Sequence, residues 1–148
     1  MLMFRRSPQG QVQVLLVHPG GPFWAKKDLG AWSIPKGEYD DPEDALEAAK
    51  REFAEETGFP VSGPFLPLGS LKQPSGKTVA VWAFESDIDP AALVSNRFEM
   101  EWPPKSGRKA SFPEIDRADW FSLAEAREKL IKGQVGFLDA LEKVVRRD

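Results

Sequence analysis

The stretch PKGEYDDPEDALEAAKREFAEETGF, residues 35–59, gathers acidic side chains in a chain whose net charge is only -3. Asp41 and Pro42 provide a helix-start signal and Gly58 provides a stop, so we expect a helix over residues 43–57. Like charges repel when they share one face of a helix, and the repulsion lowers the stability of that helix. A concentrated acidic face therefore indicates that a cation binds there.

The predicted helix has an apolar stripe next to an acidic arc. At about 100° per residue, the apolar residues that include Phe53 fall on one side, which we expect to be buried. Glu52, Glu55 and Glu56 fall on the adjacent arc, so three carboxylates lie one turn apart at the edge of a buried surface. Carboxylate oxygens suit Mg²⁺, Mn²⁺ and Ca²⁺. The arc therefore predicts a divalent-metal platform; the alternative is an ordinary solvated helix rich in alanine and glutamate.

The composition of the chain excludes several kinds of catalytic and metal-binding site. The chain has no cysteine, which excludes disulfides, thiolate metal sites and cysteine nucleophiles. It has a single histidine, His18, which excludes a histidine-cluster zinc site, and we expect this residue only to end a strand. With 20 basic and 23 acidic residues, bulk electrostatic binding to nucleic acid or to a membrane is not expected. The sequence shows no signal peptide and no membrane span, so we predict a cytoplasmic protein.

The rest of the chain predicts mixed strands and helices in a single domain, residues 1–148. Their spacing lacks the regularity of βαβ units, which indicates an α/β sandwich around a mixed sheet. The expected strands cover residues 11–18, 65–73, 77–86 and 117–123, and the other expected helices cover residues 123–132, with a capping box at Ser122 and Glu125, and 134–147. Residues 19–38 form a long loop of a length that is usually functional. Residues 87–113 carry prolines, a short helix near 90–95 and a basic loop.

The flanks of the acidic arc follow a longer pattern. Gly37 is followed by five residues, Glu43, seven residues and then REFAEETGF, residues 51–59. This run resembles the Nudix box, G-x5-E-x7-R-E-U-x-E-E-x-G-U, in which U is a bulky apolar residue. Every constrained position matches, and the one mild departure is that both U positions are phenylalanine instead of an aliphatic residue. The preceding WSIPK, residues 32–36, also resembles the usual lead-in to this box.

The resemblance implies a Nudix fold, an α/β/α sandwich around a mixed β-sheet with a loop–helix–loop catalytic motif. It implies a hydrolase that uses Mg²⁺ or Mn²⁺ to cleave a pyrophosphate bond in a nucleoside diphosphate linked to another moiety. Carried over by position, Glu52, Glu55 and Glu56 are implied as the metal ligands, helped by the backbone carbonyl near Lys36. Water attack on an anionic pyrophosphate needs cations that bridge its oxygens, which agrees with this set of ligands.

The resemblance also implies supporting residues. Arg51 and Glu43 are implied to pair with the glutamates and orient them. Glu52 is implied either as a metal ligand or as the base that positions the attacking water, and the sequence leaves both roles open. Many relatives add a carboxylate from outside the box, and we favour Glu114 because some relatives place such a residue on the loop before a late strand. The other candidates for this carboxylate are Glu85, Glu99 and Glu101, and the alternative is a solvated loop acid.

Basic and aromatic residues around the box suggest the substrate. Lys36 gives PKG where many relatives have PGG, which resembles members that act on dinucleoside polyphosphates or diphosphoinositol phosphates. Lys27 can add a phosphate contact and Trp24 can stack on a base, whereas Trp32 is expected in the core. We therefore predict a small nucleoside polyphosphate as substrate, with dinucleoside polyphosphates or NTPs favoured. The alternatives are hydrolysis of ADP-ribose or sugar nucleotides, removal of pyrophosphate from RNA 5′ ends, and a non-catalytic nucleotide-sensing module.

Overall fold

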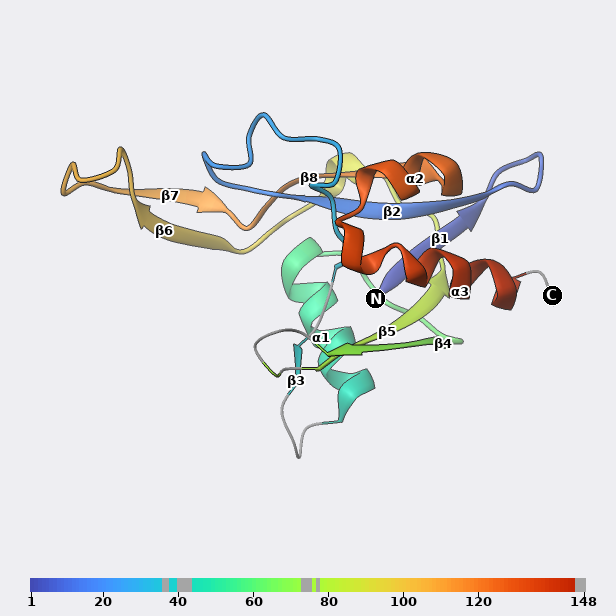
Figure 1. Ribbon diagram of the computed structural model, residues 1–148. Coiled ribbons are helices and arrows are strands. Elements are labelled where there is room, and N and C mark those ends of the chain that lie inside the picture. The colour runs from blue at the N-terminus through green and yellow to red at the C-terminus, as the bar shows by residue number, and fades with distance from the viewer. Residues whose placement is uncertain (36–37, 40–43, 73–75, 77, 146–148) are drawn as a thin grey trace.

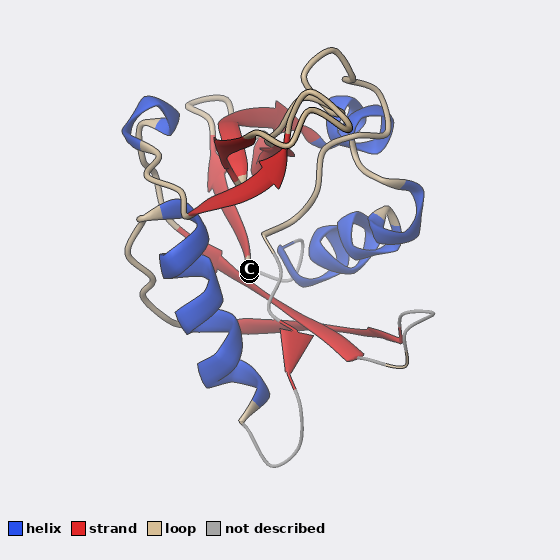
Figure 2. Ribbon diagram, turned by 90° about the vertical axis from the view of Figure 1, so that its left-hand side faces the viewer, coloured by secondary structure: helices blue, strands red, loops and turns tan. Residues whose placement is uncertain are grey.

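The computed structural model describes residues 1–35, 38–39, 44–72, 76 and 78–145. Its centre is a mixed sheet with helix α1 (Ala45–Thr57) against one face. Helices α2 (Leu123–Lys129) and α3 (Gly136–Val145) pack against the other face, and Figure 2 shows the helices on opposite sides of the strands. This arrangement confirms the α/β sandwich around a mixed sheet that the sequence predicts.

Six strands form the central sheet. They are β1 (Leu2–Arg6), β2 (Val12–Pro19), β3 (Glu38–Tyr39), β4 (Leu66–Lys72), β5 (Thr78–Glu85) and β8 (Ile115–Ser122). The order is β3-β5-β1-β2-β8, and β4 pairs with β5. β1 and β5 run parallel, whereas the other pairs are antiparallel, so the sheet is mixed. All four predicted strands are confirmed, with small shifts at their ends.

Strand β1 was not predicted from the sequence. Leu2 and Phe4 pack into the apolar cluster on the α2 and α3 side of the sheet, whereas Met1 and Met3 pack into the cluster on the α1 side. Because both faces are covered here, residues 1–4 form a short apolar run without the alternation that marks a half-buried strand. Pairing with β2, the next strand along the chain, and with the distant β5 is what makes this segment a strand.

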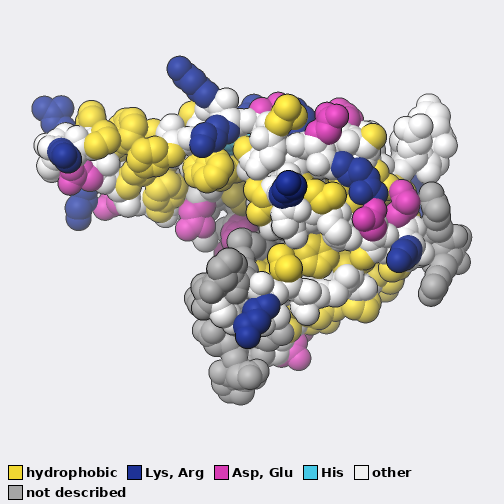
Figure 3. Space-filling view, in the orientation of Figure 1, with side chains coloured by type: hydrophobic (Ala, Val, Ile, Leu, Met, Phe, Trp, Pro, Cys, Tyr) yellow, Lys and Arg dark blue, Asp and Glu magenta, His cyan; other side chains and the backbone are white. Residues whose placement is uncertain are grey.

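A second, separate sheet projects from the body as an arm (Figure 1). It consists of β6 (Arg97–Glu101) and β7 (Lys109–Pro113), which the sequence analysis did not predict. The half-buried side chains of Phe98 and Met100 lie opposite Phe112 and Ala110. Figure 3 shows hydrophobic side chains along this arm and Lys or Arg side chains at its tip. The predicted basic loop is therefore the turn of a hairpin.

Helix α1 begins at Ala45 and not at residue 43 as predicted. The side chain of Asp44 accepts a hydrogen bond from the backbone N–H of Glu47 at 3.0 Å, so Asp44 is the N-cap. The predicted start signal at residues 41–42 lies outside the described residues. The predicted end is confirmed, because Gly58 follows Thr57 in the left-handed conformation with φ of 73°.

The two later helices also follow the prediction, with shifted ends. Ser122 and Glu125 form the predicted capping box at the start of α2. α2 ends at Lys129 instead of residue 132, because Leu130 is extended and bridges to Trp32. Short 3-10 turns lie at Pro90–Ala92, where a short helix is predicted, and at Lys132–Gln134 before α3. Among the described residues no helix is long and apolar enough to cross a membrane.

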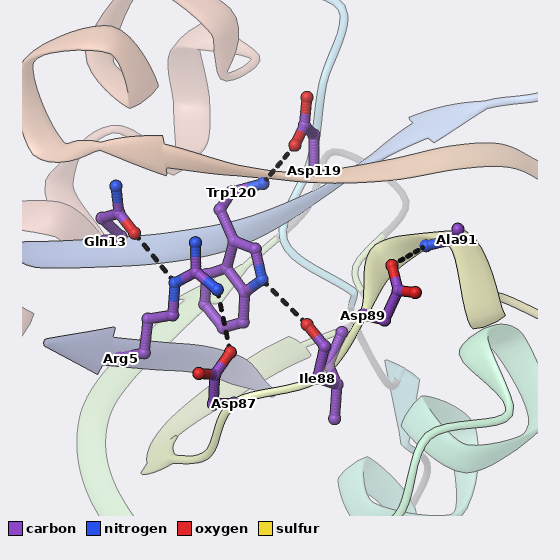
Figure 4. A network of polar contacts seen from close by, with 8 residues as sticks. All are labelled: Arg5, Gln13, Asp87, Ile88, Asp89, Ala91, Asp119 and Trp120. Atoms are coloured by element: carbon purple, nitrogen blue, oxygen red, sulfur yellow. Dashed lines mark hydrogen bonds and ion pairs between the residues drawn. The ribbon is translucent and has the colours of Figure 1, made fainter. Parts of the chain in front are cut away.

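Trp120 on β8 anchors the segment that leads from β5 toward the arm (Figure 4). Its indole N–H donates to the carbonyl of Ile88 at 3.1 Å. The guanidinium of Arg5 lies over the indole ring, 4.3 Å from the ring centre, and donates to Gln13 and Asp87, each at 2.8 Å. This network holds the segment between β5 and the arm against the sheet and places Trp120 at the rim of the core.

Candidate active site

The acidic arc lies beside a buried stripe on α1, as the sequence predicts. Phe53 is only 1% exposed and packs edge-on against Phe84 of β5, with the ring centres 5.5 Å apart. Glu52 and Glu56 are half-buried, and Glu55 is exposed. The three carboxylates therefore lie along one border between the core and the solvent.

Arg51 contacts two of the three glutamates of the arc. Its guanidinium nitrogens lie 3.4 Å from an Oε of Glu52 and 3.9 Å from an Oε of Glu55. Ion pairs this exposed contribute little to folding stability. Their effect is to hold the side chains on the arc, and this contact agrees with the orienting role that the resemblance implies for Arg51.

Glu56 and Glu114 line the same cavity, which has a volume of about 150 Å³. Its other lining residues are Val17, Pro19, Ser33, Ile34 and Ile115. The structure thus brings one carboxylate of the box together with the favoured carboxylate from outside it. The remaining candidates lie elsewhere: Glu99 and Glu101 are on the arm, and Glu85 lies 3.7 Å from Arg6 at the end of β5.

A larger cavity, of about 550 Å³, lies at the opposite end of β2. Arg6, Val12 and Glu142 are among its lining residues, and among the described residues that line it none belongs to the box. Glu142 is the one carboxylate in this described lining. The smaller cavity is therefore the better candidate for hydrolytic chemistry, since chemistry depends on the groups that converge and not on volume.

Gly20 directly follows β2 and brings the start of the long loop beside Glu114. Its backbone N–H donates to the carbonyl of Glu114 at 2.8 Å. A Cβ at this position would lie 1.9 Å from the carbonyl oxygen of Pro113, so only glycine allows the two backbones to come this close. The loop of residues 20–31 therefore starts at the edge of the cavity.

This loop carries two of the predicted substrate-binding residues. Trp24 is 40% exposed, and the ammonium of Lys27 lies 5.1 Å from the centre of its ring. Trp32 is 3% exposed and its indole N–H donates to Asp28 at 2.8 Å, which confirms that it belongs to the core. Phe23 packs edge-on against Trp102 of the arm, with the ring centres 5.4 Å apart. Trp24 thus remains the tryptophan of this loop that a ligand can reach.

The α-amino group of Met1 is a neighbour of the site that the sequence analysis missed. It is buried and donates to the carbonyl of Pro35 at 2.7 Å. Burial lowers the pKa of this amine to about 5, and the negative charge of Glu56 acts in the opposite direction. No local pattern in the sequence marks this group, because its position depends on the pairing of β1 inside the sheet.

Several predicted residues lie outside the described part of the chain. Lys36, Gly37 and Glu43 belong to this group, so the structure says nothing of their positions. Within the ranges that the structure describes, no three acidic or histidine side chains converge closely enough to hold a metal ion. The metal ligands implied for Glu52, Glu55 and Glu56 therefore remain a prediction.

Comparisons with known proteins identify the family. A family profile described as the NUDIX domain matches residues 1–141. The chain is 34% identical over 88 residues to an uncharacterized 17.7 kDa protein of Enterobacteria phage T4, and this match spans 57% of each protein. The chain belongs to the NUDIX family.

Solved structures share this fold over nearly the whole chain. An Ap4A hydrolase from C. elegans, solved as a binary complex, has a TM-score of 0.68 at 19% identity, over 99% of this chain and 96% of that one. The NUDIX domain of Shewanella oneidensis NrtR, solved with ADP-ribose, has a TM-score of 0.61 at 18% identity, over 97% of this chain and 84% of that one. At such identities the likeness shows the fold alone.

Proposed function

We propose that this protein hydrolyses a pyrophosphate bond in a nucleoside polyphosphate with the help of Mg²⁺ or Mn²⁺. Dinucleoside polyphosphates and NTPs are the favoured substrates. The observation that carries the proposal is the cavity that Glu56 and Glu114 line together beside the acidic arc. Two carboxylates at one small cavity repel each other unless a proton or a cation lies near them. A divalent cation that also binds the anionic substrate would remove this repulsion.

The donor groups fit a hard divalent cation. Glu52, Glu55, Glu56 and Glu114 offer only carboxylate oxygens, which are the ligands that Mg²⁺ and Mn²⁺ prefer. Arg51 holds Glu52 and Glu55 through exposed contacts of 3.4 and 3.9 Å, so leaving Arg51 for a cation costs these side chains little. The bound cation would neutralise charge on the pyrophosphate oxygens.

Proton transfer requires a carboxylate close to the attacking water. Glu114 and Glu52 are the two candidates, and both have the chemistry of a general base. Glu114 is the candidate that lines the cavity, and the hydrogen bond from Gly20 fixes its main chain there. We propose that Glu114 acts as the general base and that the glutamates of the arc bind the metal ion.

The loop of residues 20–31 supplies contacts for the nucleotide. Trp24 offers an exposed indole face on which a base can stack, and such stacking is typically favourable by about 1–3 kcal/mol. Lys27 places an ammonium next to the same ring, where it can bind a phosphate of the stacked nucleotide. Support for a dinucleoside substrate comes from the fold shared with an Ap4A hydrolase.

ADP-ribose is the second candidate substrate. The observation in its favour is the shared fold with the NrtR NUDIX domain, which was solved with ADP-ribose. It also offers a base and a diphosphate to Trp24 and Lys27. A second charged lysine, such as Lys36 just before the box, would attract a longer phosphate chain more strongly than this diphosphate.

A substrate panel tests the proposal. A four-phosphate dinucleoside, an NTP, ADP-ribose and a 5′-triphosphate RNA are incubated with wild-type protein and Mg²⁺ or Mn²⁺, and products are separated by chromatography. We expect the highest kcat/KM for the four-phosphate dinucleoside and no turnover with EDTA. Turnover that persists in EDTA contradicts the metal role. A clear preference for ADP-ribose contradicts the substrate assignment, and no hydrolysis of any compound contradicts the proposed reaction.

A further inference from the structure

His18 does more than end a strand, which is all that the sequence analysis expects of it. The residue lies on β2, is 0% exposed and packs edge-on against Trp32, with the ring centres 5.1 Å apart. Its Nδ1 lies 2.8 Å from an Oδ of Asp116 on β8, and its Nε2 lies 2.6 Å from the backbone carbonyl of Lys27. A buried imidazole thus connects two strands of the sheet to the middle of the long loop.

Both partners of this imidazole accept hydrogen bonds. A carbonyl oxygen cannot donate, so Nε2 is the donor to Lys27. The carboxylate of Asp116 accepts from Nδ1 when that nitrogen also carries hydrogen. Asp116 in turn lies 3.9 Å from a guanidinium nitrogen of Arg117. The hydrogen bond from Nε2 is partly buried, where competition from water is reduced, and it holds the carbonyl of Lys27 in place.

The loop is attached to the body on both sides of Lys27. Gly20 binds the carbonyl of Glu114 at its start. Near its end, Asp28 accepts from Trp32 and from the ammonium of Lys129, and the N–H of Gly30 donates to the carbonyl of Glu128 at 3.0 Å. The contact from His18 fixes the segment between these attachments, which includes the exposed Trp24.

We infer that His18, with Asp116, is a positioning residue for substrate binding: it sets the place of Lys27 and Trp24 relative to the cavity of Glu56 and Glu114. The inference rests on the proposed function for the substrate that these two side chains bind. Asp116 lies on β8, two residues after Glu114, so one imidazole connects the nucleotide-binding loop to the strand that directly follows the proposed base. The expected effect of losing this contact is on substrate affinity, because His18 is not among the residues lining the cavity.

Limited trypsin digestion of the folded protein tests the anchor without any substrate. His18→Phe keeps a ring against Trp32 but removes both polar contacts, so we expect cleavage after Lys26 and Lys27 to become about tenfold faster, as for the loss of a hydrogen bond to a charged group. Cleavage after Lys105 and Arg108 on the arm should not change. Equal rates after Lys26 and Lys27 in the variant and the wild type overturn the anchor.

Three further variants, one of them a control, decide the question if His18→Phe does not fold. His18→Gln retains an N–H of similar reach, and we expect it to restore most of the protection of Lys27. Asp116→Asn should expose Lys26 and Lys27 partly, whereas Asp119→Asn, on the same strand, should not. If Gln protects no better than Phe, or if Asp119→Asn acts like Asp116→Asn, the assignment of this pair is wrong.

Kinetics tests the positioning role. We expect His18→Phe to raise KM for the preferred substrate of the panel about tenfold while kcat changes less than about twofold. In a Trp24→Ala background the same substitution should raise KM much less, because both changes act through one loop. A fall in kcat at unchanged KM, or fully additive effects, overturns the role. If the panel shows no hydrolysis at all, the proposed function fails, while the digestion still decides whether His18 anchors the loop.

Discussion

Glu56 and Glu114 line one cavity although Glu56 lies on α1 in the first half of the chain and Glu114 lies between β7 and β8, far along the sequence. Glu114 immediately precedes β8, whose pairing with β2 brings it to the site. The loop that starts at Gly20 leaves from the end of the same β2 strand. The position of β2 therefore sets both the proposed base and the proposed nucleotide-binding loop.

Metal binding should depend on Glu56. Glu56→Gln removes one carboxylate from the cavity, and we expect the Kd for Mg²⁺ or Mn²⁺ measured by calorimetry to rise at least about tenfold. Glu47→Gln is the matched control. Glu47 lies on the same helix, but it is not part of the arc and its carboxylate lies 3.1 Å from the ammonium of Lys50. Unchanged binding in Glu56→Gln, or no divalent binding by the wild type, would contradict the metal site.

Glu52→Gln should separate stability from activity. The substitution keeps the shape of the side chain, removes repulsion on the arc and loses the contact with Arg51 at 3.4 Å, so we expect metal-free stability to change by less than about 0.5 kcal/mol. Turnover should fall by about 10²–10⁴-fold, the scale for losing a metal clamp or a general base. Thermal melts in EDTA and metal-dependent rates measure the two effects. Strong destabilisation with normal turnover would make the residue structural.

Phe53→Ala should act on folding. Phe53 is buried against Phe84, and truncation of a buried phenylalanine typically lowers the free energy of unfolding by about 3–5 kcal/mol. Phe23→Ala is the control, because Phe23 is 60% exposed and its truncation should cost less than about 1 kcal/mol. Urea denaturation compares the two. A cost below about 1 kcal/mol for Phe53→Ala would show that this stripe is not part of the core.

Lys27→Ala should weaken binding of long phosphate chains most. Its ammonium adjoins the exposed Trp24, so we expect KM for a four-phosphate dinucleoside to rise about threefold to tenfold, and KM for ADP-ribose to rise less. Lys143→Ala, on the exposed side of α3, serves as the control of equal charge. Equal effects on both substrates would argue that Lys27 does not select for phosphate chain length.

Asp28 should make stability depend on acid pH. Hydrogen bonds from Lys129 and Trp32 hold the pKa of the Asp28 carboxyl below its ordinary value of 3.8. The folded state therefore binds this proton less readily than the unfolded state, so the contribution is present above pH 3.8 and is lost as the pH falls through the folded-state pKa. We expect wild type to melt at a higher temperature than Asp28→Asn at pH 6. This difference should shrink below pH 4, whereas a constant difference would exclude the linkage.

The sequence by itself determined the features that depend only on residues close together in the chain. The acidic arc, the buried stripe with Phe53 and the left-handed stop at Gly58 all follow from the order of residues within one helix. The same holds for the capping box at Ser122 and for β2, where residue type and local spacing are sufficient. These features were predictable because helix periodicity and capping depend on positions only a few residues apart.

Tertiary structure alone decided which distant groups meet. β1 became a strand through partners on both sides, and the arm formed because its apolar residues pair across a hairpin. The family resemblance already favoured Glu114 over three other glutamates, but only the fold brings it to one cavity with Glu56. The contacts of His18 with Asp116 and Lys27 have no local signature. Such contacts depend on strand order and on the faces that packing covers, which no pattern of adjacent residues records.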